Sequence, residues 1–193
     1  MFIGREKELS ALEGLYRSDK FEFVVIYGRR RVGKTALINH FIDDKKSIYF
    51  MGVESNEKQN LENLSRSIME YSNDMPEDTY FASYQAALEY VFKISEKERV
   101  ILTIDEYPYV ARESKSLAST LQLLIDKYKD TSRLMLILCG SSMSYMEDHV
   151  LAYKAPLYGR RTAQMKILPF DFGECCRCFK KLSDEDKALI YGI

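Results

Sequence analysis

Residues 21–39 of this chain are FEFVVIYGRRRVGKTALIN. The segment FVVIY is an apolar, β-branched run that predicts a buried strand, and ALIN opens a stretch with the apolar spacing of a helix. Between them, Gly28, Gly33, Lys34 and Thr35 fit the pattern G-x-x-x-x-G-K-[ST]. Such a loop wraps phosphate with backbone N–H groups, while the lysine reaches the outer phosphates and the hydroxyl ligates Mg²⁺. The stretch therefore predicts a strand, a phosphate-binding loop and a helix in succession.

We expect the whole loop and the start of the helix to contact the ligand, because the N-terminus of a helix offers free N–H groups and a positive dipole end to an anion. The side chains of the three arginines in the loop have two interpretations. Arginines at a loop tip are usually solvated, and one of these could instead contact phosphate. The predicted binding residues are Gly28, Arg29, Arg30, Arg31, Val32, Gly33, Lys34, Thr35 and Ala36.

The composition limits the size of the fold and the kind of partner. With 193 residues, 46% of them hydrophobic, the chain can bury one sizeable core, which predicts one domain. Lys and Arg (28) nearly balance Asp and Glu (29), so no overall positive field attracts nucleic acid. Any nucleic-acid partner would be reached only through another domain. There is no apolar run near 18 residues and no signal-peptide pattern. We therefore expect a cytoplasmic protein without a membrane partner.

A second signal is the apolar run RVILTIDE at residues 99–106, which ends in two carboxylates. A continuous apolar run predicts a strand buried on both faces, and open parallel sheets bind ligands at the carboxyl ends of their strands. Downstream of a phosphate loop, this run resembles a Walker B element. Asp105 would then help Thr35 to hold Mg²⁺, and Glu106 would orient or polarise the attacking water.

Four cysteines are present, three of them in the sequence ECCRC at residues 174–178. Zinc sites need separated ligand pairs, and neither His40 nor His149 lies at a suitable spacing from this cluster. Free thiols in a reducing compartment are therefore favoured over a metal site.

Five short motifs follow one another along the chain: FIGRE near the amino end, then GRRRVGKT, LTIDE, LCGSS and LYGRRT. As a set, they resemble the prokaryotic "archaeal-type" ATPase family of the STAND branch within the AAA+ ATPases. The resemblance covers essentially the whole chain and implies ATP or ADP with Mg²⁺ as ligands. It also implies that Phe2 and Ile3 touch the adenine and that Arg5 lies near the nucleotide. An ordinary amphipathic first helix is the alternative for this segment.

The resemblance assigns roles to two further motifs. In such ATPases the strand beside Walker B ends in a polar sensor of the γ-phosphate, and Ser141 or Ser142 matches that place; a helix N-cap is the competing role. Arg160 or Arg161 would contact phosphate in cis or act as an arginine finger toward a neighbouring molecule. Surface salt bridges are the alternative for these arginines.

We expect an α/β phosphate-loop NTPase core in three layers, with helices on both faces of a parallel sheet. The resemblance implies the strand order 5-1-4-3-2. Helical spacing predicts further helices at 56–71, 82–94 and 115–128, and residues 145–155 are expected to be irregular. Residues 1–193 are expected to form a single domain without the C-terminal lid, winged-helix region and further domain of such relatives. The five predicted strands are 22–27, 47–53, 99–104, 133–139 and 163–168.

The function expected from these features is Mg²⁺-dependent ATP binding and hydrolysis that serves as a conformational switch. The expected partners are a second copy of the chain or a C-terminal domain. Hydrolysis of ATP by this core alone would be slow, because lids and arginine fingers accelerate hydrolysis. A small-molecule kinase is one alternative, although Asp105 and Glu106 at a strand end favour water as the acceptor. A scaffold that binds nucleotide with negligible turnover is the other.

Overall fold

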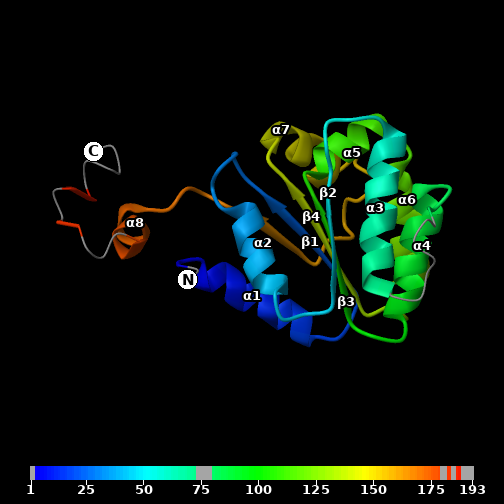
Figure 1. The fold of residues 1–193 in the computed structure, drawn as a ribbon, viewed down its shortest axis with the longest axis horizontal. Coiled ribbons are helices and arrows are strands. Elements are labelled where there is room, and N and C mark those ends of the chain that lie inside the picture. Colours follow the sequence, from blue (N-terminus) through cyan, green and yellow to red (C-terminus); the bar gives the residue numbers. More distant parts are fainter. Residues whose placement is uncertain (1–2, 73–79, 179–181, 184–185, 188–193) are drawn as a thin grey trace.

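In the computed structural model, which describes residues 3–72, 80–178, 182–183 and 186–187, a five-stranded sheet lies between two layers of helices (Figure 1). All neighbouring strands pair in parallel, in the order β2-β3-β4-β1-β5. Counted from the other edge, this is the expected order 5-1-4-3-2, so the predicted α/β fold is confirmed. The strands are β1 (Glu22–Tyr27), β2 (Ser47–Met51), β3 (Val100–Asp105), β4 (Leu134–Gly140) and β5 (Ala163–Lys166).

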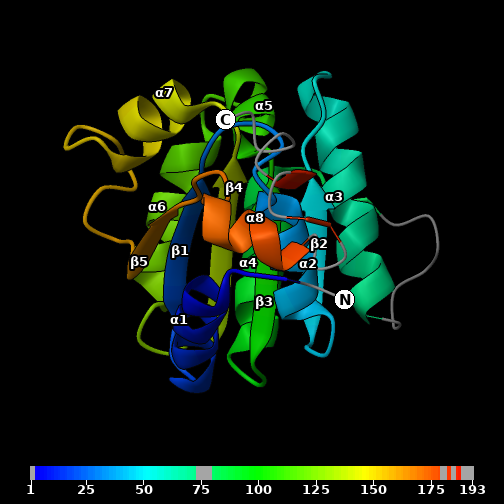
Figure 2. The same cartoon turned by 90° about the vertical axis from the view of Figure 1, so that its left-hand side faces the viewer.

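The helices fall into groups by their place around the sheet (Figures 1 and 2). One face carries α1 (Glu6–Arg17) and α2 (Lys34–Ile42), and the other carries α3 (Glu57–Ser72), α4 (Tyr84–Ser95) and α6 (Leu117–Tyr128). At the carboxyl edge of the sheet lie α5 (Tyr107–Glu113) and α7 (Met143–Met146), which is followed by the π-helix η1 (Glu147–Leu151). The last helix, α8 (Phe172–Cys178), projects beyond α1 and α2. None of the helices described is long and apolar enough to cross a lipid bilayer.

The apolar runs of the sequence form the centre of the sheet. Every residue of β1, β3 and β4 is buried, because helices cover both faces of these strands. The edge strands β2 and β5 alternate between more and less buried positions. Two hydrophobic clusters result, one under α3, α4 and α6 and one under α1 and α2. This arrangement fixes the carboxyl ends of β1, β3 and β4 side by side, where ligands of open parallel sheets bind.

Some boundaries differ from the sequence expectation. The strand predicted at 47–53 ends at Met51, because the chain turns at Val53, whose N–H and C=O both bond to the buried Asn60 side chain at 3.0 Å. The prediction that residues 145–155 are irregular is wrong in part. The helix α7 continues to Met146, and the π-helix η1 spans Glu147–Leu151. Burial of Met146 and Val150, four residues apart, accounts for the helical path.

The end of β5 brings a later part of the chain beside the phosphate loop. The N–H of Ile167 donates to the carbonyl of Tyr27 at 2.7 Å, one residue beyond the end of β5. A Cβ on Gly28 would lie 2.2 Å from the Ile167 carbonyl oxygen. Glycine is therefore required at this position by close backbone approach. As a consequence, the residues that follow Ile167 line the same site as the loop.

Candidate nucleotide site

The phosphate loop connects β1 to α2 in the way that its pattern predicts. Gly33 caps α2 with φ +89°, a left-handed conformation that glycine adopts without strain. Lys34, the first residue of the helix, is only 6% exposed, and its Nζ donates to the carbonyl oxygens of Gly28 at 3.0 Å and Arg29 at 2.9 Å. The ammonium group is thus held on the inner side of the loop, where a phosphate chain wrapped by the loop would meet it.

The carboxylate at the end of β3 lies beside the hydroxyl of the loop. Asp105 is fully buried, and its Oδ2 accepts a hydrogen bond from the Thr35 hydroxyl at 2.7 Å. Its other oxygen, Oδ1, accepts from the backbone N–H of Glu106 at 2.8 Å. A hydroxyl and a carboxylate in contact are the hard oxygen ligands that Mg²⁺ prefers. The donor set therefore fits the magnesium ion that the phosphate loop implies, with Thr35 and Asp105 as the residues that would hold it.

Glu106 is held by the neighbouring strand. Its backbone is left-handed, with φ +49°, as the chain leaves β3 for α5. Its Oε2 accepts two hydrogen bonds from Ser141, one from the hydroxyl at 2.9 Å and one from the backbone N–H at 3.1 Å. Ser142 occupies the N-cap position of α7 without a side-chain cap bond. Ser141 is thus the serine that contacts the candidate catalytic carboxylate, and its role as a sensor of the γ-phosphate stays a prediction.

Two cavities adjoin the loop, and they differ in character. The first, of about 540 Å³, combines three cationic side chains with one carboxylate, as a phosphate pocket with a catalytic acid would. Its lining is Arg30, Arg31, Gly33, Lys34, Thr35, Ala36 and Glu106. Lys34 and Thr35 at the start of α2 and Glu106 after β3 therefore line the same cavity.

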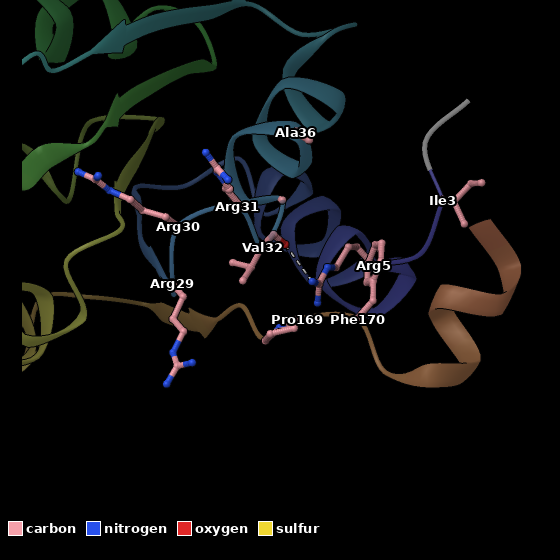
Figure 3. A pocket seen from close by; sticks show the side chains of 10 residues that line it. Ile3, Arg5, Arg29, Arg30, Arg31, Val32, Ala36, Pro169 and Phe170 are labelled. Atoms are coloured by element: carbon pink, nitrogen blue, oxygen red, sulfur yellow. Dashed lines mark hydrogen bonds between the residues drawn. The ribbon is translucent and has the colours of Figure 1, made fainter. Parts of the chain in front are cut away.

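The second cavity, of about 610 Å³, is more apolar and lies between the loop, the amino-terminal segment and the segment after β5 (Figure 3). Its size falls within the range of about 300–1,000 Å³ that is usual for small-molecule sites. The predicted base-binding residues Ile3 and Arg5 line it, and Phe2 lies outside the described residues. Further lining residues are Arg29, Arg30, Arg31, Val32, Gly33, Ala36, Pro169 and Phe170.

Arg5 joins three segments at this cavity. Its side chain is 5% exposed and donates to the carbonyl oxygens of Val32, at 3.1 Å, and Leu168, at 2.5 Å. Its guanidinium stacks on the Phe170 ring at 4.5 Å (Figure 3). Arg5 also has φ +65°, which a non-glycine residue adopts only where its surroundings hold it. The amino-terminal segment is therefore fastened to the phosphate loop and to the segment after β5.

The three loop arginines are exposed and point in different directions (Figure 3). Arg30 donates to the Tyr109 hydroxyl of α5 at 2.5 Å. Arg30 and Arg31 line the phosphate cavity, whereas Arg29 lines only the second one of these two. Contact of Arg31 with a bound phosphate is consistent with this placement and stays a prediction.

The structure does not bring Arg160 and Arg161 to the phosphate loop. Arg160 makes a two-pronged ion pair with Asp126 of α6, at 2.9 and 2.6 Å, which matches the surface salt bridge that was the alternative. Both arginines precede β5, which begins beside Val24 of β1, whereas the loop follows the other end of β1. At about 3.3 Å per residue, the separation along the sheet is roughly 10 Å or more. The expected contact of Arg160 or Arg161 with a phosphate bound to the same molecule is therefore corrected. Their role as an arginine finger toward a neighbouring molecule stays a prediction.

Several residues of the site were not predicted from the sequence. Pro169 and Phe170 line the second cavity, and the Tyr109 and Tyr49 hydroxyls bond to Arg30 and Asp105. Of the segment after β5, only the start of α8 has a recognisable sequence pattern. Asp171 and Glu174 form a reciprocal capping box at 2.7 and 3.0 Å, which could have predicted α8.

Together, the parallel sheet, the loop between β1 and α2 and the acidic end of β3 define the phosphate-loop NTPase class. Within that class, the chain belongs to the family of ATPase domains found predominantly in Archaea, whose model matches residues 2–193. The uncharacterized protein MJECL04 of Methanocaldococcus jannaschii is 36% identical over the whole chain, which spans 42% of that protein. The uncharacterized ATP-binding protein MJ0423 of the same organism is 48% identical over 46 residues, which are 24% of this chain and 78% of that protein.

Solved structures show the same fold at low sequence identity. The Walker-type ATPase PABY2304 of Pyrococcus abyssi superposes with a TM-score of 0.72 at 20% identity, covering 98% of this chain and 62% of that one. The ORC1 protein of Aeropyrum pernix, solved in complex with DNA, gives a TM-score of 0.68 at 13% identity, with 98% and 50% covered. The chain thus spans less than two thirds of MJECL04 and of both these structures.

Proposed function

We propose that this domain binds ATP with Mg²⁺ and hydrolyses it to ADP and phosphate as a nucleotide-driven conformational switch. The observation that carries the proposal is that Lys34, Thr35 and Glu106 line one cavity, while the buried Asp105 carboxylate contacts the Thr35 hydroxyl. Lys34 would neutralise the outer phosphates, and the loop N–H groups would wrap them. Membership of an ATPase family supports the same activity.

Glu106 would act as the general base. A water molecule attacks the γ-phosphorus, the bond to the β-phosphate oxygen breaks, and ADP leaves with that oxygen. The Glu106 carboxylate would orient the water and accept its proton, while Ser141 fixes the carboxylate from β4. Mg²⁺, when bound, supplies charge neutralisation of the phosphate oxygens. Among the described residues that line the two cavities, none forms a separate site for a substrate that would accept the phosphoryl group, so water is favoured as the acceptor.

The test is direct. Calorimetry with ATP in excess Mg²⁺, and phosphate release under single-turnover conditions, should show binding that Mg²⁺ tightens and slow conversion to ADP. Binding without any phosphate release on the scale of hours would favour the nucleotide-binding scaffold. Phosphate transfer to an added small molecule, with no release to water, would favour the kinase.

The switch part of the proposal rests on Arg5. Because it bonds to Val32 of the phosphate loop and to Leu168 before α8, a change in the loop is transmitted to the segment that leaves the domain. Arg177 of α8 also pairs with Glu6 at 3.2 Å. We propose that a neighbouring copy or a C-terminal domain receives this signal, and that nucleic acid is contacted only through other domains. Hydrogen exchange of residues 168–178 should differ between the ATP- and ADP-bound states.

We propose that the second cavity holds the adenine, and Phe170→Ala tests this placement. Stacking of a base on an aromatic ring contributes about 1–3 kcal/mol, so the Kd for ATP should rise by roughly 5- to 150-fold. Binding of tripolyphosphate, which has no base, should change less than about twofold. Calorimetry with both ligands gives the comparison.

The matched control is Phe172→Ala, because Phe172 lies in α8 but does not line the cavity. It should leave ATP affinity unchanged. Deletion of residues 1–5 is a less selective test, since it also removes the bond from Arg5 to the phosphate loop. Equal losses for ATP and tripolyphosphate in Phe170→Ala would mean that Phe170 supports the loop and does not contact the base.

A further inference from the structure

Tyr49 of β2 reaches the candidate metal site from a strand that carries none of its predicted residues. Its hydroxyl donates to Asp105 Oδ2 at 2.8 Å, across 56 residues of sequence. In the β2–β3 register, Tyr49 pairs with Thr103 and Met51 pairs with Asp105. The Tyr49 backbone therefore lies two residues, or about 7 Å, before the level of Asp105 at the carboxyl end of β3. Only a long side chain on this face of the sheet can reach the Asp105 carboxylate from there.

The hydrogen bond from Tyr49 helps to fix the orientation of the Asp105 carboxylate. Oδ2 accepts from the hydroxyls of Thr35 and Tyr49, at 2.7 and 2.8 Å, while Oδ1 accepts from the Glu106 N–H. Donors on both oxygens fix the plane of the carboxylate as well as its position. Thr35 belongs to the first turn of α2, which follows the phosphate loop, whereas Tyr49 belongs to β2 of the sheet. Tyr49 thus ties Asp105 to β2, the neighbouring strand of the sheet.

We infer that Tyr49 is a positioning residue for the metal, which orients Asp105 so that Mg²⁺ and nucleotide bind together. The inference rests on the proposed Mg²⁺-dependent function. Partners in the outer shell of a metal site typically contribute 10- to 100-fold in metal affinity or activity. Loss of the Tyr49 hydroxyl should therefore reduce the effect of Mg²⁺ on ATP binding by about tenfold, without weakening metal-free binding.

The experiment compares Tyr49→Phe with the wild type. The Kd for ATP is measured by calorimetry in EDTA and in saturating Mg²⁺, and the ratio of the two values gives the coupling between metal and nucleotide. We expect a coupling about tenfold smaller in Tyr49→Phe and a Kd in EDTA within about twofold of the wild type. Electron paramagnetic resonance of Mn²⁺ with ADP should show a correspondingly weaker ternary complex.

Tyr71→Phe is the matched control. Tyr71 also donates to a carboxylate at 2.8 Å, that of Glu98, which precedes β3 at the opposite edge of the sheet. It should lose a similar hydrogen bond and keep the wild-type coupling. Thermal unfolding in EDTA shows whether both variants are folded.

Three results would overturn the inference. Unchanged coupling in a folded Tyr49→Phe would mean that the hydroxyl only satisfies a buried carboxylate. An equal loss of affinity in EDTA and in Mg²⁺ would mean that Tyr49 supports the loop itself. If ATP binding by the wild type does not respond to Mg²⁺ at all, the proposed metal-dependent function fails, and the inference fails with it.

Discussion

Lys34→Ala is expected to abolish measurable ATP binding. The ammonium group is almost fully buried against the loop carbonyls of Gly28 and Arg29, so its charge acts in a site with little solvent screening. Removing one partner of a buried, hydrogen-bonded charge pair costs about 2–5 kcal/mol. This corresponds to a Kd for ATP that is at least roughly 30-fold higher. Calorimetry in excess Mg²⁺ measures the change.

Lys46→Ala provides the control for the loss of a lysine. Lys46 is 66% exposed and pairs with Glu98, which precedes β3 at the edge of the sheet opposite the phosphate loop. ATP affinity should be unchanged in this variant. Because Lys34 also bridges two carbonyls of the loop, circular dichroism and thermal unfolding must show that Lys34→Ala is folded. A folded Lys34→Ala with wild-type affinity would disprove the assignment of the phosphate loop.

Glu106→Gln is expected to keep nucleotide binding and to slow hydrolysis by at least an order of magnitude. General-base catalysis typically contributes about 10²–10⁴-fold, and an amide cannot accept the proton of the attacking water. The glutamine carbonyl can still accept the two hydrogen bonds from Ser141, so the geometry at the ends of β3 and β4 should persist. Single-turnover phosphate release measures the rate, and calorimetry measures the affinity.

Glu113→Gln is the control for this variant, because Glu113 is an exposed residue at the end of α5, the helix that follows Glu106. It should hydrolyse ATP at the wild-type rate. If Glu106→Gln also turned over normally, the acceptor would be another residue, and Ser141→Ala would be the next variant to measure. Reduced ATP affinity in Glu106→Gln would instead indicate a role in binding.

The sequence by itself determined the parts of this protein that depend on local pattern. The glycines and the lysine of the loop, the apolar runs of β1, β3 and β4, and the acidic end of β3 each lie within a short stretch whose backbone preference and burial agree. Periodicity located α3, α4 and α6 to within about two residues. The placement of Thr35 beside Asp105 was also predictable, since carboxyl ends of parallel strands meet at one edge. The order of the strands came from the family resemblance and is confirmed by the sheet.

The tertiary structure alone decided which side chains from distant segments meet. Tyr49 reaches Asp105 because of the β2–β3 register, and Phe170 stacks on Arg5 because β5 ends beside Gly28. Arg160 pairs with Asp126, away from the phosphate loop, because β5 starts at the far end of β1. Such contacts depend on strand register and loop path, which many combinations of residues can satisfy. No short sequence pattern encodes them, so the second cavity and the contact between Tyr49 and Asp105 emerge only when the chain is folded.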